Sequence, residues 1–399
     1  MRLTNKFLIG FMTIAACGCG QKQSDNPLLN EFTTPYGIAP FEEITIDNYR
    51  EGILLGMEEQ KAEIEAIINN PEEPTFQNTI VAMDQSGKLL RKVRGTFSPL
   101  TSSNSTEESR ALEKELSPLM SAHSDDINLN EKLFARVKKV YDNRENIKLT
   151  PEEKTVLENI YKRFVNSGAE LSEAEKEKLR ELNQQLSMLE LTFSQNLLHE
   201  TNNTFVVANS LEELKGLPQE NIDAAAKMAA DNGQPGKWMF NMQRPSCNPV
   251  LQYCENRDLR KKVYDAYYNR GNTGNEYDSK EICRQLVTLR LEKAKLMGYN
   301  NYAEMVLEDR MAKTPEAVFE LLDQVWEPAV AKAKEELDDI RAEIRKEGKN
   351  FEPAGWDYMY YLDKAKRAKF SVDEQFRLMG CSFQSSRSSC QFHMTWLQL

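Results

Sequence analysis

The sequence predicts an all-α protein of long helices, because helix breakers are scarce and apolar residues recur at helical spacing. The 399 residues include 18 glycines and 15 prolines, a content that favours long helices over a turn-rich β fold. With 40% hydrophobic and 28% charged residues, the chain can bury a sizeable core and lies outside the disordered class. Its length allows two or three domains.

The charge balance and the apolar runs exclude two further classes of protein. The net charge of -11 opposes attraction to phosphate backbones, so we expect no binding to nucleic acid. No run reaches the roughly eighteen apolar residues that a membrane-spanning helix needs, so we expect no such helix.

The first residues resemble the leader of a bacterial lipoprotein. A short basic region precedes the apolar stretch Phe7–Ala16, which is too short to span a bilayer but suits a secretory signal. Cys17 completes an Ile-Ala-Ala-Cys sequence that resembles the lipobox, in which the cysteine is acylated and becomes the N-terminus after cleavage. We therefore predict a signal peptide over residues 1–16, lipidation of Cys17 and a polar tether over residues 17–35.

This leader predicts a protein of the cell envelope that is anchored to a membrane on its periplasmic or surface side. Several acyl chains hold a protein at a membrane where a single chain is marginal. A plain signal peptide with an incidental Cys17 is the alternative. Cys19 is a weaker candidate for acylation, because Ala16-Cys17-Gly18 precedes it.

Helical signals dominate residues 45–374. Asp47 can cap a helix that stops at Asn69-Asn70-Pro71, and Thr75–Phe97 continues with apolar residues at helical spacing. The Thr-Pro-Glu-Glu sequence at residues 150–153 predicts another helix start, because proline fits the first helical position and the acids complement the helix dipole.

The strongest helical period lies in Ser172–His199. Ser172 and Glu175 form a capping box, and large apolar residues follow at steps of three or four. We predict one long amphipathic helix packed on neighbouring helices; a coiled coil is the alternative. Thr204–Ala208 is the best strand candidate because it is short and β-branched, and a helix at residues 220–230 ends in a turn.

Helix boundaries are also marked in the second half of the chain. Gly298 fits a helix C-terminus, and Thr314-Pro315-Glu316 fits a cap with the first turn of the next helix. Pro328 removes a backbone donor, so we expect it to kink that helix before the helix ends at Gly348.

The cysteines beyond the leader are odd in number, namely Cys247, Cys254, Cys283, Cys381 and Cys390. No two of them form a Cys-x-x-Cys pair, so neither a zinc ribbon nor a thioredoxin-like site is indicated. We expect the first three to pack as small apolar residues.

Two blocks of the second half carry a family resemblance. They are Asn248–Gly271 (NPVLQYCENRDLRKKVYDAYYNRG) and Leu296–Leu322 (LMGYNNYAEMVLEDRMAKTPEAVFELL). With the preceding helical sequence, they resemble the thimet oligopeptidase and peptidyl-dipeptidase family of zinc metallopeptidases over about Asn26–Glu374, and bacterial dipeptidyl carboxypeptidases are the most similar branch. The resemblance implies an almost wholly helical fold around a channel that admits short peptides, with zinc as cofactor.

The zinc site implied by the resemblance is missing from this sequence. In the family an H-E-x-x-H helix supplies two zinc ligands and a water-activating glutamate, and a later glutamate completes the site. The histidines are His123, His199 and His393, and no two stand four apart. His199-Glu200 begins like the motif, but Asn203 stands in place of the second histidine. We therefore expect a structural role for His199 and assign no catalytic or metal-binding residue.

Other chemistries have no motif in the sequence. It contains no phosphate-binding glycine loop and no G-x-S-x-G elbow. The acidic pairs within residues 335–339 fit a solvated helix face. The tyrosines within residues 264–268 and 358–361 are candidates for lining a peptide channel, although packing is the simpler interpretation.

The domain prediction places an N-terminal helical domain at residues 36–240 and the start of a catalytic domain at residues 241–374. Residues 375–399 contain no Asp or Glu, and this break in composition predicts a tail translated out of frame; a natural polar tail is the alternative.

Two functions follow from these observations. The first is a zinc metallopeptidase that removes C-terminal dipeptides from short peptides, truncated before its zinc helix and inactive by itself. The alternative is a non-enzymatic, lipid-anchored helical protein that binds peptides.

Overall fold

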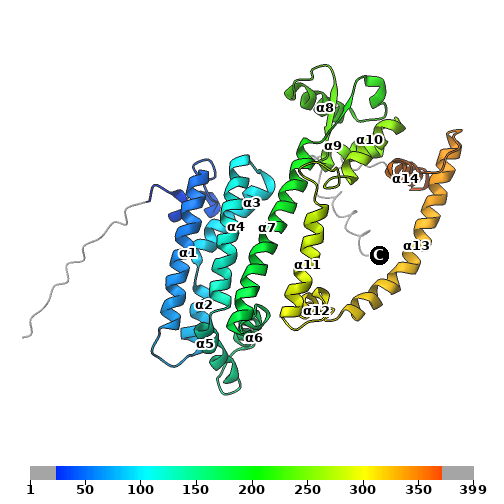
Figure 1. Cartoon of the computed structure of the whole chain (residues 1–399). Coiled ribbons are helices and arrows are strands. Elements are labelled where there is room, and N and C mark those ends of the chain that lie inside the picture. Colours follow the sequence, from blue (N-terminus) through cyan, green and yellow to red (C-terminus); the bar gives the residue numbers. More distant parts are fainter. Residues whose placement is uncertain (1–23, 371–399) are drawn as a thin grey trace, which may run out of the picture. The chain divides into compact units, whose positions relative to one another are not determined.

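The computed structural model describes residues 24–370, which divide into two compact units between Ser172 and Glu173 (Figure 1). Both units are built almost entirely of helices, which confirms the predicted fold class. Within the described range, no helix is long and apolar enough to cross a membrane. The predicted signal peptide, Cys17, and the tail from residue 375 lie outside the described residues. The predicted domain boundary at residue 240 stays a prediction.

The first unit contains short 3-10 and π-helical turns as well as α-helices. In chain order its elements are η1 (Pro27–Leu29), η2 (Pro35–Gly37), α1 (Ile46–Ile68), η3 (Phe76–Val81), α2 (Ala82–Gln85), α3 (Lys88–Ser103), α4 (Glu107–Asn128), α5 (Glu131–Asp142) and α6 (Pro151–Asn166).

Two details of the first unit differ from the sequence prediction. Thr45, not Asp47, caps α1: its side chain accepts a hydrogen bond from the Asn48 backbone N–H, and the Asn48 side chain accepts one from the Thr45 backbone N–H. Asp47 instead lies in the first turn, where its charge still complements the helix dipole. The helix predicted over Thr75–Phe97 is interrupted, because Gly87 adopts a left-handed conformation (φ 68°) between α2 and α3.

Two clusters of buried side chains hold the first unit together. One joins α1, α3 and α4 and includes Ile53, Val93 and Leu112; the other joins the end of α1 to α5 and α6. The helices α1 and α3 approach closely at Gly56, where an added Cβ would lie 2.8 Å from the Leu90 backbone. Glycine is therefore required at that crossing.

The second unit consists of long helices and one small sheet. Its elements are α7 (Glu173–Asn203), β1 (Phe205–Ala208), η4 (Leu211–Leu214), α8 (Gln219–Asp231), β2 (Trp238–Asn241), α9 (Arg244–Tyr253), α10 (Arg257–Tyr268), α11 (Lys280–Leu296), α12 (Tyr302–Leu307), α13 (Pro315–Lys346) and α14 (Gly355–Phe370).

The long helix predicted over Ser172–His199 is confirmed as α7, which packs on α11. The predicted strand is β1, and it pairs antiparallel with β2, which the sequence did not predict. Helix α13 begins after the predicted cap Thr314 and runs through Pro328 without interruption, curving along its length in Figure 1. Pro328 therefore does not divide the helix.

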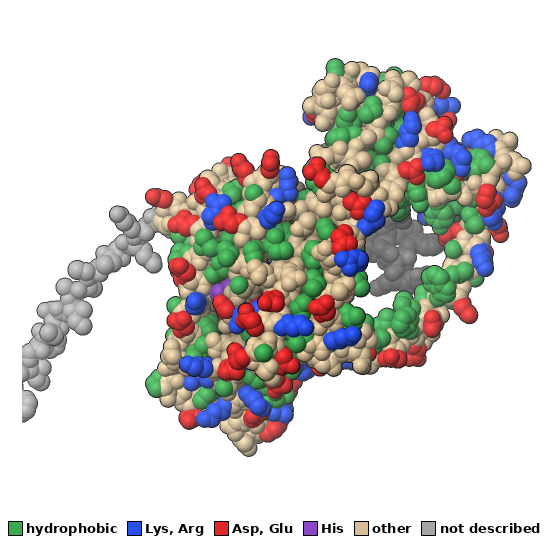
Figure 2. Space-filling model, in the orientation of Figure 1, with side chains coloured by type: hydrophobic (Ala, Val, Ile, Leu, Met, Phe, Trp, Pro, Cys, Tyr) green, Lys and Arg blue, Asp and Glu red, His purple; other side chains and the backbone are tan. Residues whose placement is uncertain are grey.

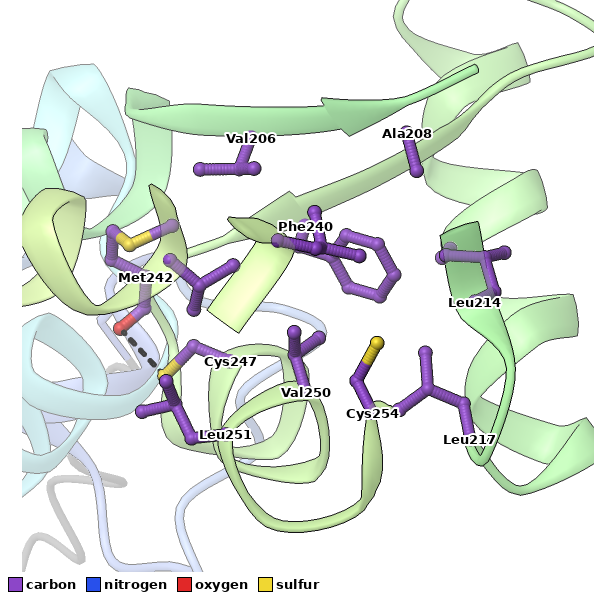
Figure 3. Close-up of a cluster of buried hydrophobic side chains, with 13 residues drawn as sticks. Val206, Ala208, Leu214, Leu217, Phe240, Met242, Cys247, Val250, Leu251 and Cys254 are labelled. Atoms are coloured by element: carbon purple, nitrogen blue, oxygen red, sulfur yellow. Dashed lines mark hydrogen bonds between the residues drawn. The ribbon is translucent and has the colours of Figure 1, made fainter. Parts of the chain in front are cut away.

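The largest core of the second unit lies beneath the small sheet (Figure 3). Phe240 of β2 and Val206 of β1 meet Val250 and the neighbouring apolar residues of α9. Cys247 and Cys254 are buried in this core, as expected, whereas the prediction for Cys283 is wrong because it is exposed on α11. The core ties the sheet to the helices that carry the polar clusters of this unit.

Candidate functional site

The C-terminal end of α7 brings a buried carboxylate to the loop that follows α10. Glu200 is 3% exposed. Its carboxylate accepts hydrogen bonds from the Gly271 backbone, from Oγ1 of Thr273 at 2.6 Å and from Nδ2 of Asn275 at 2.9 Å. Three donors from one loop therefore converge on this side chain, and they hold the loop against the helix end.

Opposing effects set the protonation of Glu200. Burial is the largest effect and raises the pKa, but the hydrogen bonds from Thr273, Gly271 and Asn275 favour the charged form, and the net pKa lies below its ordinary value. The side chain is therefore an ionised acceptor with its oxygens already engaged. It serves as an anchor for the loop rather than as a base.

The neighbours of Glu200 contact the same loop. The ring of His199 lies against Tyr277, with 3.7 Å between ring centroids. Thr201 accepts a hydrogen bond from Arg270 at 2.6 Å. Three consecutive residues of α7 thus contact the loop, His199 through its ring.

A second polar cluster joins α10 to the start of α14. Asp357 is fully buried and accepts hydrogen bonds from Arg257 (Nη2, 2.7 Å), from Arg260 (Nη2, 2.8 Å) and from the Ala354 backbone (3.0 Å). Arg260, itself 1% exposed, also donates to the backbone carbonyls of Cys254 and Trp356. A buried carboxylate that accepts hydrogen bonds from two guanidinium groups, one of them partly exposed to solvent, holds α10 and the start of α14 together.

The electrostatics of this cluster favour the ionised aspartate. Burial is again the largest effect and raises the pKa of Asp357, but the hydrogen bonds from Arg257, Ala354 and Arg260 outweigh it, so the pKa is lowered. The guanidinium of Arg260 also lies over the ring of Tyr360, 4.1 Å from its centroid. The cluster has no open position for a reacting group.

Several of the candidate channel tyrosines belong to the protein interior. Tyr360 and Tyr361 are 4% and 1% exposed and pack with α13 residues. Tyr264 lies against Tyr268, with 4.3 Å between ring centroids, and Tyr268 is largely exposed. Packing accounts for the buried Tyr360 and Tyr361 and for the partly buried Tyr264 and Tyr267.

The described residues do not fit a zinc site. Residues 24–370 contain no group of three or more His, Cys, Asp or Glu side chains placed to hold a metal ion. Nε2 of His123 is hydrogen-bonded to Oε1 of Gln60 at 2.8 Å. The carboxylate of Glu200 already accepts hydrogen bonds from Gly271, Thr273 and Asn275. His393 lies outside the described residues.

The Asp357 cluster was not predicted from the sequence. Arg257 and Arg260 stand three residues apart on one helix, which places both on the same face, but their partner lies about a hundred residues away. The contact of Glu200 with Gly271 is equally non-local. The paired arginines of α10 were the one local hint of a buried acid.

Comparison with known proteins identifies the relatives of this chain. The family described as Peptidase family M3 matches residues 250–385. The chain is 35% identical over 349 residues to dipeptidyl carboxypeptidase of Escherichia coli (strain K12), an alignment that covers 88% of this chain and 51% of that protein. Oligopeptidase A of Haemophilus influenzae is 30% identical over 357 residues, covering 88% of this chain and 52% of the relative. The chain thus spans about half the length of the curated relatives it matches.

Proposed function

We propose that the chain, whose residues 250–385 match Peptidase family M3, acts in peptide breakdown as the peptide-holding part of a zinc metallopeptidase that removes C-terminal dipeptides. The observation that carries the proposal is the similarity to dipeptidyl carboxypeptidase, which extends over 88% of the chain rather than over one motif. In this proposal the clusters around Glu200 and Asp357 give the helices a fixed geometry. Rigid support of this kind favours the binding of a flexible peptide, because the protein then loses little freedom on binding.

The proposal assigns no hydrolytic step to these 399 residues. The family implies zinc, and no two histidines of the sequence have the spacing of its H-E-x-x-H motif. In the part of the chain that the structure describes, the candidate ligands His199 and Glu200 are bound within the fold. We therefore expect the purified chain to bind short peptides without cleaving them.

Two measurements on the purified chain test this proposal. The first incubates short peptides with the chain and added zinc, and we expect no release of C-terminal dipeptides. Release that a chelator abolishes contradicts the proposal. The second titrates a fluorescent peptide with the chain, and we expect saturable binding. A flat titration would leave the chain without its proposed role.

The leader supports a membrane location for this activity. We propose that acylation of Cys17 anchors the chain in the cell envelope, on the basis of the Ile-Ala-Ala-Cys sequence that ends at Cys17. Replacement of Cys17 by Ser should abolish fatty-acid labelling and retention in the membrane fraction. A Cys19→Ser variant is the matched control and should keep both. Unchanged labelling of the Cys17→Ser variant rules the anchor out.

The same leader keeps the alternative function open, a lipid-anchored helical protein that binds peptides and has no part in hydrolysis. Peptide binding alone is common to both functions. They differ in whether the chain takes part in peptide hydrolysis.

A further inference from the structure

Two arginines of the second unit converge on one tyrosine ring. Tyr267 of α10 packs against the core beneath the small sheet. The guanidinium of Arg270 lies over the Tyr267 ring, 3.9 Å from its centroid. Arg244, the first residue of α9, forms a side-chain hydrogen bond with Tyr267 that raises the pKa of the arginine. The ring thus brings two positive charges together. We call Arg244 and Arg270 the Tyr267 arginine pair.

Arg270 is held in place and still has donors to spare. Its Nε donates a hydrogen bond to the Tyr267 backbone carbonyl at 2.8 Å, and its Nη1 donates one to Oγ1 of Thr201 at 2.6 Å. Among the described residues, none accepts a hydrogen bond from its Nη2. A guanidinium carries five N–H donors, so part of this capacity remains for another group.

The thiol of Cys247 also shows that the two charges act at one place in the fold. Burial is the largest effect on Cys247 and raises its pKa, whereas the charges of Arg270 and Arg244 both lower it. The two guanidinium groups therefore lie near the same point of α9. Like charges this close repel each other unless an anion joins them.

No carboxylate of the described residues forms an ion pair with the Tyr267 arginine pair. Glu200 is bound by its loop, and Asp265 and Asp278 pair with nearby lysines. Elsewhere acids are plentiful: the chain has 62 acidic and 51 basic residues, and Figure 2 shows the two kinds interspersed over the displayed face. The pair therefore offers a place for an anion from outside the chain.

The Asp357 cluster of the same unit shows what such a pair binds. Arg257 and Arg260 both donate hydrogen bonds to the carboxylate of Asp357. There too an aromatic ring positions a guanidinium, since Arg260 lies 4.1 Å from the ring centroid of Tyr360. A guanidinium stacked on a ring keeps its N–H edge free, and that edge matches the two oxygens of a carboxylate. The groups around Tyr267 have the same chemistry without the carboxylate.

We propose that the Tyr267 arginine pair binds a carboxylate of the peptide that this chain holds. The proposal rests on the proposed function and names the peptide group that is recognised. Every peptide with a free C-terminus carries a carboxylate, and peptides with Asp or Glu carry more. Because the net charge of -11 repels carboxylates from the protein as a whole, a local pair of cations gives them one defined place to bind.

The test titrates three labelled peptides of alanine and serine with the full chain. The first has a free C-terminal carboxylate, the second is amidated, and the third is amidated but contains one internal Glu. We expect the first to bind about tenfold or more tightly than the second, because amidation removes hydrogen bonds to a charged group. If the third also binds more tightly than the second, the pair accepts any peptide carboxylate. If only the first does, the pair selects the C-terminus.

Substitution of each arginine locates the effect. Arg244→Met removes a charge at an exposed position, and it should bring the affinities for the first two peptides to within about threefold of each other. Arg270→Gln should act in the same way, and hydrogen exchange checks that the loop after α10 stays in place. Lys262→Met is the matched control, because it removes an exposed cation from the helix that carries Tyr267, and it should preserve the preference.

The outcomes separate this proposal from the proposed function. Equal affinity of the wild-type chain for all three peptides overturns the carboxylate site, and so does a preference that survives both arginine substitutions. In either case the chain still binds peptide and keeps its proposed role. A failure to bind any of the peptides instead contradicts the proposed function, and the carboxylate site with it.

Discussion

The two units of this protein differ in how they dispose of their apolar side chains. In the first unit the large apolar residues that remain exposed are scattered over different elements: Tyr36, Ile38, Phe41, Leu54, Leu119 and Val156. In the second unit five such residues lie together on α13. Isolated exposed apolar residues are normal, whereas a contiguous group marks an interaction surface.

The units also differ in what fastens their helices. The first relies on apolar packing and on the close approach at Gly56, although it also buries Asp125, whereas in the second the buried carboxylates of Glu200 and Asp357 bind residues far away in the sequence. Buried charges are sensitive to substitution and to pH in a way that apolar packing is not. We therefore expect substitutions and changes in pH to alter the stability of the two units differently.

The largest expected effect is the loss of the buried aspartate. Asp357→Ala leaves Arg257 and Arg260 without their carboxylate, and we expect it to destabilise the second unit by about 3–5 kcal/mol. The first unit should keep its stability. Hydrogen exchange followed by mass spectrometry reads both units in one experiment. Asp338→Ala, which removes an exposed pair with Arg341, is the control and should cost less than about 1 kcal/mol.

The next largest expected effect is a difference between the two units in their loss of stability at low pH. Burial is the largest effect on Glu347 and raises its pKa, but contacts with Lys349, Lys364 and Tyr361 outweigh it and lower the pKa from 4.5 to about 2. A carboxylate with a lowered pKa stabilises the folded state above its ordinary pKa and loses that contribution as the pH falls through the folded-state value.

Glu347 belongs to the second unit, so that unit should lose on the order of 2–3 kcal/mol between pH 4.5 and about 2. Urea unfolding monitored at several pH values, with exchange probes in each unit, measures this difference. If the first unit loses as much stability over the same interval, buried charge is not what distinguishes the two.

A pair of glycine substitutions tests the packing of the first unit. Gly56→Ala places a methyl group against the Leu90 backbone, and we expect a loss of about 1–3 kcal/mol confined to this unit. Gly95→Ala in α3 meets no atom within 4 Å, so it should stabilise the helix by about 0.5–1 kcal/mol. If chemical unfolding shows that Gly56→Ala lowers the free energy of unfolding and Gly95→Ala raises it, the close approach of α1 and α3 is supported. Equal effects of the two substitutions contradict it.

The smallest expected effect belongs to the exposed apolar residues in the first half of α13. Trp326→Ala should change the free energy of unfolding by less than about 0.5 kcal/mol, because this exposed side chain has little tertiary packing to lose. Ile344→Ala on the same helix is the contrast, and it should cost about 2–5 kcal/mol because Ile344 is 1% exposed. A large cost for Trp326→Ala would mean that these residues are covered within the chain.

Local signals predicted much of the fold. The caps at Thr150 and Thr314 and the apolar period of α7 follow from interactions within a few residues, and the structure has all three. Strand β2 escaped prediction because three of its four residues are buried, so it lacks the alternation that marks a strand. The break at Gly87 was not predicted, because the apolar residues on both sides of it keep the spacing of one continuous helix.

The polar clusters could not be predicted, because their members are distant in sequence. Glu200 meets Thr273, and Arg260 meets Asp357, only after the helices between them have packed. No local pattern encodes such a meeting. Likewise, the start and end of α13 were predicted from the sequence, but the structure was needed to show that large apolar residues of its first half stay exposed.

The most direct test that the first half of α13 is exposed is limited trypsin digestion of the full chain. A helix without tertiary partners opens locally far more often than one in a packed core. We expect the first cuts within residues 24–370 to follow Arg310, Lys313 and Lys332, with the first unit intact after they are complete. Equal resistance of these sites and of the helices of the first unit would contradict the account.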